Sequence, residues 1–142
     1  MLARMTKSRT RIATALAATA LAFTAACGGG DDGGDERSEA EDAAALEEAV
    51  RTFTEVYFTD PPAAYAMLSE RCAEQSDEAT YTAQLEQFAE SFGELSVQTF
   101  SVDEIDGDTA HVTYTVGDPM IDGGLAGQPW VREDGEWRYD AC

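Results

Sequence analysis

Residues 130–139, WVREDGEWRY, contain the clearest folding signal in this chain. At their centre is Asp134-Gly135, a dipeptide that two-residue β-hairpin turns prefer because both turn positions need positive φ. Alternating residues that include Trp130 and Trp137 stand on either side of this turn. We therefore predict two antiparallel strands, over 130–133 and 136–139.

The stretch before this hairpin changes hydropathy with a period of two. Val112, Tyr114 and Val116 alternate with polar residues, which is typical of a strand with one apolar and one polar face. Residues 95–102 predict the preceding strand, and their imperfect alternation indicates a β-bulge. The dipeptide Asp106-Gly107 predicts the turn that joins the two strands.

Further upstream, the apolar residues follow a helical period. Ser38 starts a capping-box pattern, and the apolar residues over 46–57 recur at spacings of three and four. This helix is expected to end before Asp60, which can cap a second, short helix that has Pro61 at its first position. The second helix is expected to end before Cys72.

A third helix is predicted to start at Ser76 or Asp77, and Gly93 is placed to end it. Its apolar stripe consists of Tyr81, Leu85, Phe88 and Phe92. Residues 117–127 are expected to form a loop that carries the apolar pair Met120-Ile121. Three helices followed by about four strands predict an α+β fold, with the helices packed on a curved antiparallel sheet.

The charged residues are divided unevenly along the chain. Its 142 residues include 9 Lys and Arg against 28 Asp and Glu, for a formal net charge of −19. Four of the basic residues precede residue 12, where no acid occurs, so the remainder carries 5 − 28 = −23. Such a surface repels phosphate and anionic headgroups, so we exclude nucleic acid as a partner. The acidic surface has two possible explanations: it keeps the protein soluble, or it attracts a cationic partner.

The basic start is followed by an apolar run over 12–26, about 15 residues long, which is the length of a signal-peptide core. It is shorter than the roughly 20 residues that span a bilayer. The next residues are rich in Gly and Asp and cannot form a core. We predict a signal peptide over 1–26, a flexible tether over 27–41 and one folded domain over 42–142.

The end of this leader, residues 24–27 with the sequence TAAC, resembles the lipobox of bacterial lipoproteins. That family usually has Leu where this chain has Thr24. The resemblance implies that Cys27 becomes the first residue of the mature protein, carries diacylglycerol on its sulfur and anchors the protein to the extracytoplasmic face of the cell membrane. The alternative is an ordinary secretory signal that is cleaved near Ala26 and leaves Cys27 as a free thiol.

Two further cysteines, Cys72 and Cys142, belong to the predicted domain. In an exported protein, such a pair most simply forms a disulfide. A bridge here would attach the C-terminal strand to the helical layer. Two free thiols, or pairing between molecules, are the alternatives.

The predicted domain resembles the NTF2-like superfamily, and in particular its small secreted and lipid-anchored actinobacterial members. The residues that carry this resemblance are 46–58, the pair Pro61-Pro62 and the hairpin 130–139. The resemblance covers about residues 42–142 and implies a cone-shaped α+β fold. Many members bind small apolar ligands in the cone, and some are enzymes such as steroid isomerases and polyketide cyclases. The fold alone does not decide between these functions.

Several aromatic residues of the predicted elements are candidates for lining such a cone: Tyr57, Tyr65, Phe88, Tyr114, Trp130 and Trp137. Aromatic residues in such positions also serve as ordinary core. We assign no catalytic residue, because the single histidine, His111, forms no catalytic motif with Asp103 or a tyrosine. Residues 103–108 lack the ligand spacing of a calcium loop, so we expect no metal and no cofactor.

These observations predict a membrane-anchored, extracytoplasmic lipoprotein. Its domain is expected to bind a small apolar ligand or an envelope protein without catalysis. One alternative is a small enzyme of isomerase or cyclase type, which needs an acid or histidine such as Asp103 or His111 inside the cone. The other alternative is an accessory subunit of an envelope complex.

Overall fold

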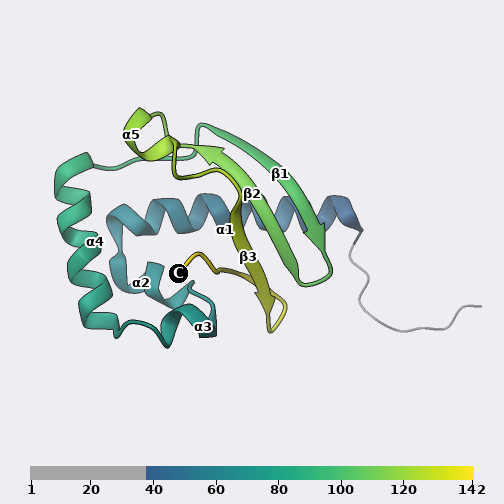
Figure 1. The fold of residues 1–142 in the computed structure, drawn as a ribbon, viewed down its shortest axis with the longest axis horizontal. Helices are drawn as coiled ribbons and strands as arrows, with labels where there is room; N and C mark the ends of the chain where they lie inside the picture. Colours follow the sequence, from purple (N-terminus) through teal and green to yellow (C-terminus); the bar gives the residue numbers. More distant parts are fainter. Residues whose placement is uncertain (1–37) are drawn as a thin grey trace, which may run out of the picture. The chain divides into compact units, whose positions relative to one another are not determined.

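A computed structural model describes residues 38–142, in which helices gather against a four-stranded sheet (Figure 1). The predicted signal peptide, Cys27 and most of the predicted tether lie outside the described residues. Within residues 38–142, no helix is both long enough and apolar enough to cross a membrane. The fold class is α+β, as the sequence predicts.

The described residues form five helices and four strands. The helices are α1 (Glu39–Thr59), α2 (Pro61–Ala66), α3 (Glu70–Ala73), α4 (Glu78–Phe92) and α5 (Pro119–Asp122). The strands are β1 (Thr99–Asp106), β2 (Thr109–Thr115), β3 (Gln128–Glu133) and β4 (Glu136–Tyr139). The prediction of three helices before all strands is therefore wrong, because α3 is additional and α5 lies between β2 and β3. Both have four residues, too few to show a helical period.

The first helix begins with the capping box that the sequence predicts. The Ser38 side chain accepts a hydrogen bond from the backbone N–H of Glu41, and the Glu41 carboxylate accepts one from the backbone N–H of Ser38. The first turn of α1 therefore includes residues 39–41, which the sequence analysis assigns to the tether. These three residues are therefore helical, because the capping bonds stabilise the turn.

The connection from α1 to α3 depends on two capping residues. The Asp60 carboxylate accepts a hydrogen bond from the backbone N–H of Ala63, and Pro61 occupies the first position of α2. The Ser69 hydroxyl accepts one from the backbone N–H of Cys72 at 3.2 Å and so starts α3. Cys72 thus lies within a helix and not between two helices.

The boundaries of α4 agree with the sequence prediction. The Asp77 carboxylate accepts a hydrogen bond from the backbone N–H of Thr80 at 3.0 Å, which caps the start of the helix. Gly93 ends the helix with a φ of 72°, a conformation that favours glycine because it has no Cβ.

The four strands form one antiparallel sheet in the order β1-β2-β3-β4. β1 begins at Thr99 and not at residue 95, because the first residue paired with β2 is Thr99, and the first backbone hydrogen bond to β2 comes from the N–H of Gln98. β1 contains a bulge at Asp103, one residue beyond the stretch 95–102 in which the sequence predicts it. Asp103 is skipped in the backbone pairing with β2, whereas Val102 and Glu104 on either side of it are both paired.

Each of the two hairpins turns on two residues. The β1–β2 turn consists of Gly107-Asp108, shifted from the predicted Asp106-Gly107, because Asp106 still pairs with Thr109. The β3–β4 turn consists of Asp134-Gly135, as predicted, with φ values of 52° and 82°. The alternation predicted for β2 is confirmed, because its buried residues are Ala110, Val112 and Tyr114.

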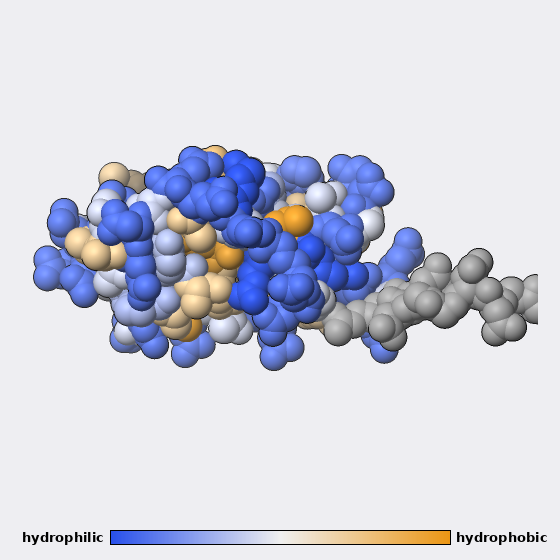
Figure 2. Space-filling model, turned by 90° about the horizontal axis from the view of Figure 1, so that it is seen from below, coloured by the Kyte–Doolittle hydropathy of each residue, from blue (hydrophilic) through white to orange (hydrophobic). Residues whose placement is uncertain are grey.

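The core lies where α1 crosses one face of the sheet (Figure 1). Trp130 and Trp137 are buried there, with exposed fractions of 1% and 4%. The guanidinium of Arg132 lies 4.5 Å from the ring centroid of Trp137, and its Nη2 is 2.8 Å from Oδ1 of Asp42 on α1. The contact between Arg132 and Asp42 is an ion pair and not an aligned hydrogen bond. Neither Nη2 of Arg132 nor Oδ1 of Asp42 has a hydrogen-bond partner among the described residues. The surface is mostly hydrophilic in the view of Figure 2.

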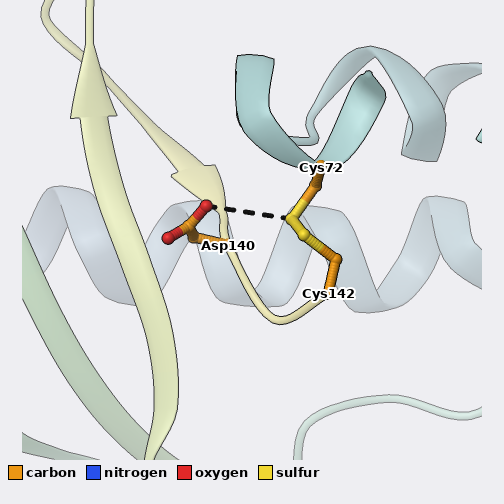
Figure 3. Close-up of side chains that lie close together, drawn as sticks. All are labelled: Cys72, Asp140 and Cys142. Atoms are coloured by element: carbon orange, nitrogen blue, oxygen red, sulfur yellow. Dashed lines mark hydrogen bonds between the residues drawn. A yellow bond between two sulfur atoms is a disulfide. The ribbon is translucent and has the colours of Figure 1, made fainter. Parts of the chain in front are cut away.

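A disulfide joins Cys72 in α3 to Cys142 beyond β4 (Figure 3). The two sulfurs are 1.99 Å apart and the Cα atoms 5.5 Å apart. The Asp140 carboxylate lies beside the bridge, 3.8 Å from the sulfur of Cys72. It accepts hydrogen bonds from the Ser69 hydroxyl at 2.5 Å and from Nε of Arg71 at 3.1 Å. The end of β4 is therefore fixed to α3 by covalent and polar contacts together.

Candidate functional site

A cavity of 330 Å³ opens where the second half of α1 meets α4, α5 and the ends of β2 and β4. It is lined by Phe53, Thr54, Tyr57, Phe58, Phe88, Phe92, Tyr114, Val116, Met120, Ile121, Gly124, Leu125 and Tyr139. Its volume lies at the lower end of the range of small-molecule sites. Two other hollows, of 380 and 560 Å³, are lined partly by charged side chains. The apolar cavity is therefore the candidate site.

Two helices supply the aromatic wall of the cavity. Residues four apart lie on one face of a helix, so Phe53 and Tyr57 project together from α1, as Phe88 and Phe92 do from α4. The rings of Tyr57 and Phe88 meet edge to face, with centroids 5.7 Å apart. The rings of Phe88 and Phe92 lie 4.5 Å apart. These contacts join the two helices into one continuous surface.

The sheet supplies the opposite wall. Tyr114 points inward from β2, Val116 follows that strand, and Tyr139 ends β4. The Tyr139 ring stacks on Phe53 of α1 with centroids 4.5 Å apart and an angle of 23° between the ring planes. The Tyr139 hydroxyl donates to Oε1 of Gln128 at 2.7 Å. Both the ring and the hydroxyl of Tyr139 are thus fixed.

The short helix α5 forms the rim of the cavity. Met120 lines the cavity, yet its side chain is 83% exposed. Among residues 38–142, every other large apolar side chain is buried or partly buried. The Asp122 carboxylate accepts a hydrogen bond from the backbone N–H of Val116 at 2.7 Å and holds α5 over the end of β2. The Asp118 carboxylate caps the helix by accepting from the backbone N–H of Met120 at 2.8 Å. Two carboxylates therefore position an exposed apolar side chain at the entrance.

None of the described lining residues is acidic or basic, although the chain contains 28 Asp and Glu. The polar groups of the lining are the hydroxyls of Thr54, Tyr57, Tyr114 and Tyr139. Burial raises the pKa of Tyr57, because it disfavours the charged phenolate. Burial also raises the pKa of Tyr114 to about 12, against a smaller opposing effect of its hydrogen bond with Thr54. The phenols are therefore neutral near pH 7.

The structure brings together three of the six predicted lining residues: Tyr57, Phe88 and Tyr114. Tyr65 lies elsewhere, where its hydroxyl donates to the backbone carbonyls of Ala73 and Ser76 at 3.0 Å each. Trp130 packs beneath the cavity against Phe53, with ring centroids 5.8 Å apart, and does not line it. Trp137 packs against Arg132. Tyr65 and Trp130 therefore belong to the supporting core, and Trp137 lines the separate hollow of 380 Å³.

Several lining residues are not indicated by the sequence. The apolar spacing over 46–57 places Phe53 only in the stripe of the first helix, and Met120-Ile121 is expected only in a loop. The stripe indicates that Phe53 faces the interior, but it does not say whether that interior is filled. The pair Met120-Ile121 carried a signal, because two adjacent large apolar residues are unusual in a polar loop.

The two residues considered for acid–base chemistry lie away from the cavity. His111 and Asp103 are both exposed, and neither lines the cavity. The Asp103 carboxylate accepts a hydrogen bond from the hydroxyl of Thr113 at 2.7 Å. The isomerase hypothesis that uses these two residues therefore loses its proton-transfer groups.

One group of potential metal ligands occurs among residues 38–142, and it consists of Cys72, Asp140 and Cys142. The two sulfurs of this group form the disulfide, so they are not available as thiolate ligands. The cavity itself offers aromatic, aliphatic and hydroxyl groups. Such a lining can hold an uncharged, largely apolar molecule.

No protein-family model and no curated protein matches this chain.

Proposed function

We propose that this protein is an extracytoplasmic lipoprotein whose α+β domain binds a small apolar ligand without transforming it. The observation that carries the binding role is the cavity of 330 Å³ with its apolar, uncharged lining. Burial of a ligand against aromatic rings is favourable because it removes apolar surface from water, at about 25 cal/mol for each Å². An entrance with an exposed methionine suits such a ligand, because methionine adapts to different apolar shapes.

The proposal extends to the fold family. An NTF2-like cone is supported by the long first helix, by the meander of four antiparallel strands and by a cavity between helices and sheet. The two unpredicted short helices are compatible with this proposal because they lie in connections and leave the sheet order unchanged.

The membrane anchor is proposed from the sequence of the leader. The segment 24–27 provides the small residues and the cysteine, and the run over 12–26 provides the apolar core of a signal peptide. Mass spectrometry of the protein recovered from the membranes of a lipoprotein-processing bacterium tests it. We expect an N-terminal Cys27 that carries diacylglycerol. An unmodified thiol at Cys27 would contradict the anchor.

Ligand binding can be tested with N-phenyl-1-naphthylamine, a neutral apolar probe whose fluorescence increases in apolar surroundings. We expect saturable binding to the full chain. The variant Ile121→Trp places a large side chain in the lining and should weaken binding about tenfold or more. The matched control Ile105→Trp changes a partly buried isoleucine of β1 outside the lining and should bind as the original chain does. Absence of saturable binding would refute the proposed function.

A further inference from the structure

Some hydroxyl groups of the cavity lining already donate their proton in a hydrogen bond within the protein, and others do not. The Thr54 hydroxyl donates to the backbone carbonyl of Val50 at 2.8 Å, inside its own helix. The Tyr139 hydroxyl donates to Gln128 at 2.7 Å. The Tyr114 hydroxyl interacts with the side chain of Thr54, which lowers the pKa of Tyr114 against the larger effect of burial.

Tyr57 is different, because its hydroxyl has no hydrogen-bond partner among residues 38–142. All its recorded contacts are made by the ring, which meets Phe53 at 5.8 Å, Phe58 at 5.1 Å and Phe88 at 5.7 Å. These contacts fix the ring within the aromatic wall of the cavity. A ligand that covers this hydroxyl without pairing with it pays the cost of a buried unpaired polar group, so a ligand that accepts a hydrogen bond from it binds more tightly.

The Tyr57 hydroxyl lies within electrostatic reach of the other phenols that surround the cavity. Tyr57 raises the pKa of Tyr114 and Tyr139, which also line the cavity, in addition to the effect of their burial. Burial raises the pKa of Tyr57 itself, so it keeps its proton near pH 7 and can donate it. Tyr57 thus offers the cavity an O–H donor that no residue among 38–142 uses, beside apolar walls.

The charges of the cavity lining and of the whole chain restrict the charge that a ligand can carry. An anion would enter a lining that has no basic side chain, after approaching a chain of formal net charge −19. A cation would be attracted from a distance but would lose its hydration in a lining that has no carboxylate. Aromatic faces offset this loss only in part. An uncharged ligand has neither cost.

We propose that the ligand is an uncharged apolar molecule with one hydrogen-bond acceptor, such as a ketone, ester or ether oxygen, which accepts from the Tyr57 hydroxyl. This inference rests on the proposed function and specifies its ligand class. Tyr57 is then the residue that distinguishes an acceptor-bearing molecule from a hydrocarbon of the same shape. One hydrogen bond of ordinary strength makes a difference of about fivefold in affinity.

Three probes with one ring system separate these effects: naphthalene, 2-acetylnaphthalene and 2-naphthoate. Equilibrium titration of the full chain near pH 7, followed by probe fluorescence, should show 2-acetylnaphthalene as the tightest. Naphthoate should bind about 100-fold more weakly or not at all, since its charge would be buried unpaired. A naphthyl-trimethylammonium probe tests the cation. If that probe or naphthoate binds as tightly as 2-acetylnaphthalene, the inferred ligand class is wrong.

The variant Tyr57→Phe removes the donor and keeps the ring. Its loss of affinity should be about fivefold greater for 2-acetylnaphthalene than for naphthalene. The control Tyr65→Phe removes a hydroxyl outside the cavity and should show no such difference between the two probes. Equal losses for both probes in Tyr57→Phe would overturn the inference while leaving apolar binding intact. If no probe binds the original chain at all, the proposed function fails as well.

Discussion

The rings of Phe53 and Tyr139 stack with centroids 4.5 Å apart, which joins the first helix to the last strand at the wall of the cavity. Phe53 is only 3% exposed and also meets Trp130 edge to face. This residue therefore contributes both to the core and to the lining of the cavity. Stability and ligand binding are coupled at this position.

Replacement of Phe53 by alanine should lower the free energy of unfolding by about 3–5 kcal/mol, because it leaves a large void in a packed core. Urea denaturation measures this loss. The matched variant Phe58→Ala truncates a partly exposed phenylalanine of the same helix and should cost clearly less. Similar losses for the two variants would show that Phe53 has no special role in the core.

Removal of the disulfide should destabilise the protein by about 4 kcal/mol, according to the chain-entropy model for a loop with a sequence separation of 70. The double variant Cys72→Ser with Cys142→Ser avoids a leftover thiol and can be compared with the original chain by urea denaturation. Dithiothreitol should destabilise the original chain and leave the double variant unchanged. Labelling of Cys72 or Cys142 by a thiol reagent in the native, unreduced protein would contradict the bridge.

Alkaline pH should destabilise the domain through its buried phenols. The pKa of Tyr114 is raised from 10.0 to about 12, so the folded state holds this proton more tightly than the unfolded state does. The contribution of the Tyr114 proton to the free energy of unfolding is complete below pH 10 and is lost as the pH rises towards 12. Two pKa units correspond to about 3 kcal/mol.

Urea denaturation at several pH values above 9, together with the phenolate absorbance, measures this alkaline loss. The variant Tyr114→Phe should lose less stability over that pH interval than the original chain. If both chains respond equally, Tyr114 does not contribute to the pH dependence.

Replacement of Met120 should change the affinity for the ligand and leave the stability of the fold almost unchanged. It is 83% exposed, so Met120→Ala is expected to change the free energy of unfolding by less than about 0.5 kcal/mol. Binding of N-phenyl-1-naphthylamine should weaken a few-fold, whereas Met120→Leu should keep an apolar rim. Mild oxidation to the sulfoxide should act like alanine, because it makes the side chain polar. Identical binding by the alanine and leucine variants would exclude Met120 from the entrance.

Local signals in the sequence were sufficient for most element boundaries. Ser38, Asp60 and Asp77 each cap a helix through their own side chain, so a few neighbouring residues determine where the helix starts. The turn at Asp134-Gly135 is determined by two residues in the same way. The helices α3 and α5 were missed because four residues do not establish a period.

The cavity was predicted only in part, for a different physical reason. Tyr57, Phe88 and Tyr114 face the interior of their elements, which periodicity indicates. Trp130 faces the interior too, yet its side chain fills the core. Whether an inward aromatic residue lines a void or closes one depends on the distance between layers. That distance is set by all the packed side chains together and not by any single stretch of sequence.

The stacking of Phe53 on Tyr139 also sets an order of events during synthesis. A growing chain presents α1 first, and the strand that covers Phe53 is made only after α4 and the rest of the sheet. At usual rates of translation this interval is roughly 4–20 seconds. Until then Phe53 lacks its ring partners Trp130 and Tyr139, so this part of α1 is a segment that a chaperone or an export factor can recognise before the domain closes.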